Sequence, residues 1–141
     1  MKSVSTFVLI LLVWPAVILP AAPMVTQIGA GNEFSIFLES DGSLWATGSG
    51  RALGDGVYNS EVLRPEEIIS NGVVTIAANG SSLFLKSDGS LWGMGDGTYG
   101  QLGDGSYSGT NRPEEIVSNN VIAISPTTSS LNPTTPSGAW A

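Results

Sequence analysis

Short apolar segments separated by glycine-containing turns dominate the chain after residue 24. Two segments are apolar at successive positions, Ile36-Phe37-Leu38 and Leu83-Phe84-Leu85. A continuous apolar run of this length favours a strand that is covered on both faces. Asp41-Gly42 and Asp88-Gly89 follow these runs, and Asp-Gly is typical of a two-residue hairpin turn in which both central residues have positive φ. The pattern therefore predicts two β-hairpins of similar build.

Extending this interpretation along the chain predicts four strands in each of two units. The expected strands are residues 25–28, 34–39, 43–47 and 66–70 in the first unit, and residues 73–77, 83–85, 90–94 and 114–118 in the second. Asn71-Gly72 and Asn119-Asn120 are the expected turns that lead from each fourth strand into a following strand, because Gly and Asn tolerate positive φ. Glycine-rich loops at Gly48–Gly56 and Gly93–Gly105 separate the third and fourth strands.

The two units are copies of one repeat. Val25, Val73 and Val121 are spaced by 48 residues, and Arg64-Pro65-Glu66-Glu67-Ile68 recurs 48 residues later. The Asp-Gly-Ser-Leu-Trp segment recurs after 47 residues. Its positions, together with Gly103 of the second loop, are the structural markers of the repeat: Asp41, Gly42, Trp45, Asp88, Gly89, Trp92 and Gly103. Four strands in about 48 residues match the blade of a β-propeller, so the fold class is all-β, with two four-stranded antiparallel blades and the beginning of a third.

The pattern V-x-x-I-x-A-G, then S-x-x-L-x-S-D-G-x-L-W, then G-Q-L-G-D-G resembles the repeats of the regulator of chromosome condensation family. Gly100-Gln101-Leu102-Gly103-Asp104-Gly105 matches it closely. The resemblance covers residues 25 to about 124 and implies a β-propeller, which this family normally closes with seven blades. Two positions depart from it: Phe34 and Ser82 stand near where the family has a histidine, and Arg51-Ala52 replaces the Gly-Gln of the first copy.

The first residues predict that the protein is exported from the cytoplasm. Lys2 precedes an uncharged apolar run, residues 7–19, which ends at Pro20-Ala21-Ala22-Pro23. This is the plan of a secretory signal peptide over residues 1–23. An uncleaved anchor is the alternative, because residues 4–25 carry no charge, but Pro15 argues against a regular spanning helix. We therefore expect a secreted or cell-envelope protein that contacts a membrane only through this segment, if at all.

The expected units are a signal segment at residues 1–23, repeats at 24–72 and 73–120, a degenerate third repeat at 121–131 and a Ser/Thr/Pro-rich tail at 132–141. Two blades leave open faces and unpaired edges, since each repeat buries its apolar surface against its neighbours. Three explanations remain open: a fragment of a longer propeller protein without a function of its own, assembly of several copies through the open faces, or two sheets that stack alone.

Composition narrows the function. The net charge is -7, which disfavours nucleic acid as a partner. The chain has neither Cys nor His, so disulfides, thiol chemistry and the commonest general base are excluded. Asp96 and Asp104 are too few and too far apart for a calcium loop, and Glu66-Glu67 alternate across a strand rather than converge. We therefore expect no enzyme activity, no metal and no cofactor.

The remaining functional candidates are polar and aromatic residues of the glycine-rich loops. Loops that carry Tyr, Asn, Ser and Gly make adaptable recognition surfaces. The candidate binding residues are Tyr58, Tyr99, Gln101 and Tyr107. The sequence thus predicts an exported, non-enzymatic scaffold that binds an extracellular protein or glycan. The family resemblance allows a narrower alternative, because a secreted bacterial inhibitor of β-lactamases is similar in using loop aromatics of such a propeller.

Overall fold

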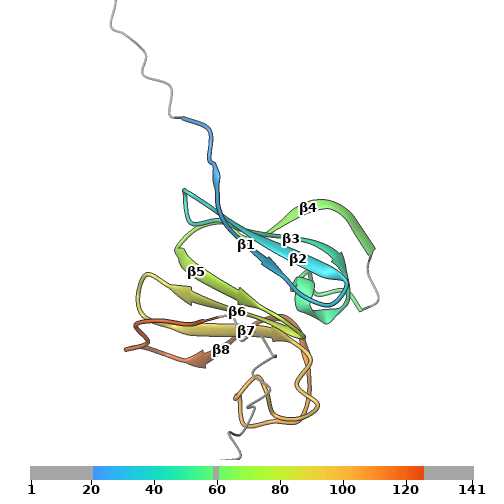
Figure 1. Cartoon of the computed structure of the whole chain (residues 1–141). Helices are drawn as coiled ribbons and strands as arrows, with labels where there is room; N and C mark the ends of the chain where they lie inside the picture. The colour runs from blue at the N-terminus through green and yellow to red at the C-terminus, as the bar shows by residue number, and fades with distance from the viewer. Residues whose placement is uncertain (1–20, 59–60, 126–141) are drawn as a thin grey trace, which may run out of the picture.

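The computed structural model describes residues 21–58 and 61–125, and these form two four-stranded antiparallel sheets. In each sheet every strand pairs with its neighbours in sequence. The first sheet, called blade 1, contains β1 (Val25–Ala30), β2 (Phe34–Glu39), β3 (Leu44–Ser49) and β4 (Glu61–Ile69). Blade 2 contains β5 (Val73–Ala78), β6 (Ser81–Lys86), β7 (Leu91–Gly95) and β8 (Thr110–Val117). Figure 1 shows the two blades stacked face to face. The predicted all-β, blade-like fold is confirmed.

The outermost strands begin earlier in the chain than predicted. β4 begins at Glu61 and β8 at Thr110, whereas the sequence predicts starts at Glu66 and Glu114. Both strands run through the Arg-Pro pair, whereas the sequence predicts that each strand starts after it. Proline is tolerated because these are edge strands and because Pro65 and Pro113 lie where the pairing shifts its register, so neither proline has a paired position in the ladder. The strand expected after Asn120 is also absent from the described residues 121–125, where no partner strand lies beside it.

The Asp-Gly turns differ from the predicted type. Gly42 and Gly89 each have a φ of 82°, whereas Asp41 and Asp88 are not among the residues with positive φ. In blade 1 the Gly42 N–H donates to the Glu39 carbonyl at 3.0 Å. This is the geometry of a three-residue loop, in which a type I turn is followed by a left-handed glycine. The prediction of two positive φ values was wrong because the serine before each Asp also belongs to the loop.

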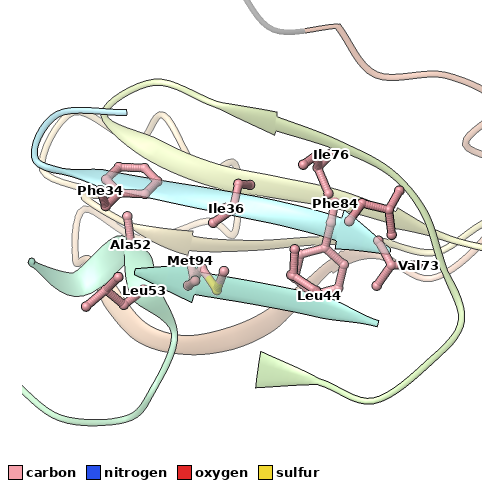
Figure 2. Packing of buried hydrophobic residues seen from close by; sticks show 11 residues of the cluster. Phe34, Ile36, Leu44, Ala52, Leu53, Val73, Ile76, Phe84 and Met94 are labelled. Atoms are coloured by element: carbon pink, nitrogen blue, oxygen red, sulfur yellow. The ribbon is translucent and has the colours of Figure 1, made fainter. Parts of the chain in front are cut away.

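The hydrophobic core lies between the two blades. Ile36 and Leu44 of blade 1 and Phe84 and Met94 of blade 2 are fully buried within one cluster. Figure 2 shows these side chains meeting between the blades, with Val73 and Ile76 of β5 at one side of the cluster. Because β2 alternates, Ile36 faces blade 2 while its neighbour Phe37 points the other way and is only half-buried. The core is therefore an interface between repeats.

A short 3-10 helix, η1 (Arg51–Leu53), fastens the loop of blade 1 to blade 2. Leu53 is fully buried in the core, and the Ser82 hydroxyl of β6 donates to the Ala52 carbonyl at 2.9 Å. Further along the loop, the Gly56 N–H donates to the Asn111 carbonyl of β8 at 2.8 Å. The loop between β3 and β4 is thus held to blade 2 by one contact with β6 and one with β8.

The predicted signal peptide lies almost entirely outside the described residues, as do most of the degenerate third repeat and the whole tail. In the part of the chain that the structure describes, no helix is long and apolar enough to cross a membrane.

Candidate functional site

The repeated Asp-Gly-Ser-Leu-Trp segment forms a hydrogen-bonded chain that links turn to strand. In blade 2 the Asp88 Oδ1 accepts from the Ser90 N–H at 2.9 Å and from the Ser90 hydroxyl at 2.5 Å. The Ser90 Oγ in turn accepts from the Trp92 indole N–H at 2.8 Å. Asp41, Ser43 and Trp45 repeat the arrangement in blade 1. The carboxylate, hydroxyl and indole therefore stabilise the hairpin.

These hydrogen bonds predict acid sensitivity. Donation from the Ser90 hydroxyl and N–H lowers the pKa of Asp88 below its usual 3.8, and Ser43 does the same for the pKa of Asp41. A lowered folded-state pKa stabilises the protein above the unfolded-state pKa, and this contribution is lost as the pH falls through the folded-state value. We expect the Tm to fall as the pH decreases below about 4. Thermal unfolding of wild type and Asp88→Asn would show a shallower acid decline in the variant; parallel curves would contradict this origin.

The two tryptophans occupy equivalent positions with different surroundings. Trp92 packs against the inter-blade core, with its ring stacked on Phe84 at a centroid distance of 6.3 Å. The Lys86 ammonium lies 4.1 Å from the Trp92 ring centroid, which keeps the charge over an aromatic face. Trp45 is half-buried on the side of blade 1 that faces away from blade 2. Packing between the blades therefore describes Trp92 and not Trp45.

Tyr99, Gln101 and Tyr107 come together in the loop between β7 and β8. The Tyr99 N–H donates to the Gln101 Oε1 at 2.8 Å. A side chain added at Gly100 would meet the Tyr107 ring at 3.6 Å, so this ring lies directly against Gly100. The Tyr99 and Tyr107 side chains are nevertheless 87% and 80% exposed. The loop therefore presents two aromatic rings and an amide to solvent from one short segment.

The base of this loop is held in place. The Gly100 N–H donates to the Gly97 carbonyl at 2.8 Å, and the Gly103 N–H donates to the Gly100 carbonyl at 3.1 Å. The Thr98 hydroxyl and N–H donate to the Asp96 carboxylate. These donors lower the pKa of Asp96, with a smaller contribution from the Arg51 charge. Pinned turns reduce the entropy that the loop would lose on binding a partner.

Tyr58 belongs to the corresponding loop of blade 1 and is 60% exposed. The Arg51 guanidinium lies 5.3 Å from the centroid of its ring. Arg51 also reaches the β7–β8 loop, where a side chain at Gly109 would meet its Nη1 at 3.1 Å. Figure 1 shows η1 and the β7–β8 loop at the same end of the two sheets. We call Tyr58, Tyr99, Gln101 and Tyr107 together the loop surface.

A cavity beside the loop surface was not anticipated from the sequence. It has a volume of about 390 Å³ and lies at the β5–β6 turn of blade 2. Its lining combines the turn with Leu83 and with two of the predicted binding residues: Ala77, Ala78, Asn79, Gly80, Ser81, Leu83, Tyr99, Gln101 and Ser125. The lining residues come from separate segments, so no local pattern marks the cavity.

The described residues contain no group of three or more Asp, Glu, His or Cys side chains placed to hold a metal ion. The carboxylates of the Asp-Gly turns each accept a hydrogen bond from the backbone N–H two residues further along the chain, so their geometry supports turn formation.

Two stacked antiparallel sheets, each with strands in sequence order and a core between them, define a pair of β-propeller blades. Residues 25–52 and 88–125 match two family models, both described as the regulator of chromosome condensation (RCC1) repeat. These two segments are therefore repeats of this type, as the motifs predicted.

Solved structures support the assignment of the fold. Human WBSCR16 is 27% identical, with a TM-score of 0.59 over 68% of this chain and 26% of its own. Yeast RCC1 (Prp20) bound to Kap60 is 22% identical, with a TM-score of 0.61 over 71% of this chain and 26% of its own. A structure of Prp20p from Saccharomyces cerevisiae gives 21% identity and a TM-score of 0.60 over 71% of this chain and 27% of its own. The chain thus spans about a quarter of the length of these structures. None of the curated proteins compared matches the sequence.

Proposed function

We propose that this chain is an exported, non-enzymatic propeller-repeat scaffold that binds another protein through the loop surface. The observation that carries the proposal is the pair of exposed tyrosine rings, Tyr99 and Tyr107, on a loop whose base is fixed by hydrogen bonds. Tyrosine offers a large contact area at low conformational entropy cost, which makes it an effective anchor in binding loops.

The relatives favour a protein over a glycan as the partner. One yeast structure holds RCC1 (Prp20) bound to Kap60, and Prp20p from Saccharomyces cerevisiae is described as binding Gsp1p and histones. These partners belong to the yeast protein; for this chain they support only the general capacity of such repeats to bind proteins. The net charge of -7 favours a partner with a basic surface.

Export remains part of the proposal and rests on the sequence. The charged Lys2, the apolar run at residues 7–19 and the small residues that follow have the order of a signal peptide. A fusion of residues 1–23 to a reporter enzyme without its own signal would test it. Activity of the reporter outside the cytoplasm is expected, and retention in the cytoplasm would contradict export.

Loss of the loop tyrosines should weaken partner capture. We expect Tyr99→Ala with Tyr107→Ala to weaken binding by about 2 kcal/mol or more, roughly 30-fold in Kd, because each ring is an exposed anchor. The full chain serves as bait for envelope and secreted proteins of its source, and captured proteins are quantified by mass spectrometry.

Val74→Ala is the matched control, since Val74 is 47% exposed on β5, on a different element from the loop surface. It should capture the same proteins as wild type. Equal capture by the double tyrosine variant, or no specific capture by wild type, would refute binding through the loop surface.

A further inference from the structure

The interface between the two blades shows which side chains pack when one blade lies against another. Blade 2 contacts blade 1 with one side of β5, β6 and β7, which we call its contact face. Five residues of this face are Val73, Ile76, Ser82, Phe84 and Trp92. The first four are at most 6% exposed, because blade 1 covers them.

Blade 1 carries a similar face with nothing described against it, with Thr47 where blade 2 has Met94. The equivalent positions follow from the strand registers, in which Ile28 pairs with Phe37 and Phe37 with Trp45, as Ile76 pairs with Phe84 and Phe84 with Trp92. We call this side the open face of blade 1, with residues Val25, Ile28, Ser35, Phe37 and Trp45. The residue types are identical to those of the contact face at all five positions.

The exposed fractions of its side chains show that no blade covers the open face of blade 1. Ile28 is 68% exposed while its equivalent Ile76 is 6% exposed, and Val25 is 51% exposed while Val73 is 3% exposed. Contiguous apolar side chains that are buried in one repeat and exposed in the other mark an interaction surface. Burying them would stabilise an association by the same apolar contacts that hold the two blades together.

The side of blade 2 that faces away from blade 1 carries apolar side chains of the kind that pack against such a face. On blade 1 the receiving residues are Ile36, Leu38, Leu44 and Leu53, all at most 3% exposed. Their equivalents form the open face of blade 2: Leu83, Leu85, Leu91 and Leu102. Leu83 and Leu91 are only half-buried, although Ile36 and Leu44 are fully buried, whereas Leu85 and Leu102 are 5% and 3% exposed. The two open faces of one chain are therefore complementary to each other.

The position of the cavity beside Tyr99 and Gln101 agrees with the packing of another blade against blade 2. On blade 1 the corresponding place is filled by the β5–β6 turn of blade 2. The Asn32 N–H donates to the Asn79 carbonyl at 3.1 Å, and a side chain at Gly29 would meet the Ala78 Cβ at 3.0 Å. The cavity lies where the next blade would insert its own first turn. In a second copy that turn is the β1–β2 turn, at residues 31–33.

We propose that a second copy of this chain docks by the open face of its blade 1 onto the open face of blade 2, with its β1–β2 turn in the cavity. The contact is head-to-tail, so it leaves one free face at each end and permits rings or longer assemblies. Tyr99 and Gln101 line the cavity and also belong to the loop surface, so docking of a second copy and partner binding share these two residues. Since each chain carries net negative charge, association strengthens as added salt screens the repulsion.

Residues 121–125 of the same chain begin toward the position on blade 2 that β1 of a second copy would occupy. The Val121 N–H donates to the Gly89 carbonyl at 3.1 Å, as the Val73 N–H donates to the Gly42 carbonyl at 3.0 Å. The segment therefore starts along the course that β5 follows on blade 1. It forms no strand within the described residues and Ile122 is 95% exposed, so a second copy's β1 replaces few contacts there.

A complementation experiment tests the proposal on the full chain. Ile28→Asp places a charge on the open face of blade 1, and Leu83→Asp places one on the open face of blade 2. Sedimentation velocity over a concentration series should show self-association for wild type and monomers for each variant. A 1:1 mixture of the two variants should form a dimer and nothing larger, because each variant retains the face that the other has lost.

Val74→Asp controls for added charge, since Val74 is exposed and its equivalent in blade 1 is the polar Thr26. It should associate like wild type. Dimer formation in the mixture also proves that both face variants are folded. A wild type that stays monomeric at every concentration and salt level would overturn the proposal, as would variants that associate alone through another surface such as the apolar N-terminal run. A failed tyrosine experiment with intact complementation would refute only loop binding.

Discussion

Phe84→Ala is expected to destabilise the protein by about 4 kcal/mol, the largest effect of any single truncation in the core. The Phe84 ring is fully buried between the blades and stacks on Trp92 at 6.3 Å with an interplanar angle of 13°. Its removal leaves a cavity at the centre of the interface, and the stacking contact is lost as well. Since a domain of this size is stable by roughly 5–15 kcal/mol, a large fraction of the variant should unfold under mild denaturant. Urea unfolding followed by tryptophan fluorescence measures the change.

Phe37→Ala provides a matched comparison because Phe37 is the same residue at the equivalent position of blade 1. Its ring is half-buried on the open face, so its removal should cost only about 1–2 kcal/mol at concentrations where the chain is monomeric. Equal losses for the two variants would show that the interface between the blades is not the main core.

Gly48→Ala is expected to cost about 3 kcal/mol or more, because strain and a backbone clash combine there. Gly48 lies in β3 with a φ of 114°, which alanine adopts only under strain. An added Cβ would also lie 2.3 Å from the Glu33 carbonyl oxygen, which belongs to the backbone and cannot move aside as a side chain would. The strand pairing between Phe34 and Gly48 would have to open to relieve this contact. Urea unfolding of the variant measures the loss.

Gly72→Ala separates the two causes. Gly72 has a φ of 84°, and no heavy atom lies within 4 Å of an added Cβ. Only backbone strain remains there, and it should cost about 1–2 kcal/mol. If Gly48→Ala were no more destabilising than Gly72→Ala, the backbone contact at Glu33 would be of no consequence.

The hairpin motifs were predictable because their cause is local. Asp88, Gly89 and Ser90 form their turn through hydrogen bonds within three residues, and the repeat at Asp41 behaves identically. The starts of β4 and β8 were predicted wrongly because Pro65 and Pro113 lie at register shifts of edge strands, where they have no paired position in the ladder. Whether a strand lies at an edge depends on its neighbours, and local sequence does not report them.

The candidate site was predictable in part for a similar reason. Tyr99, Gln101 and Tyr107 lie within nine residues, so a single loop was bound to bring them near one another. The role of Arg51 depends on a loop some 45 residues away in the chain, near Asp96 and Gly109, and was not anticipated. The cavity joins the β5–β6 turn to Tyr99, and it exists because nothing described fills a place that blade 2 fills on blade 1.

The sequence by itself determined the repeat, most of its strands and the apolar character of both faces of the second strand in each unit. The tertiary structure alone decided which of two equivalent faces is buried. Ile28 and Ile76 occupy the same position of the repeat, yet 68% of one and 6% of the other remain exposed. The physical reason is that the burial of a blade face depends on the neighbouring blade. Blade 1 covers the contact face of blade 2, whereas no described residue covers the equivalent open face of blade 1.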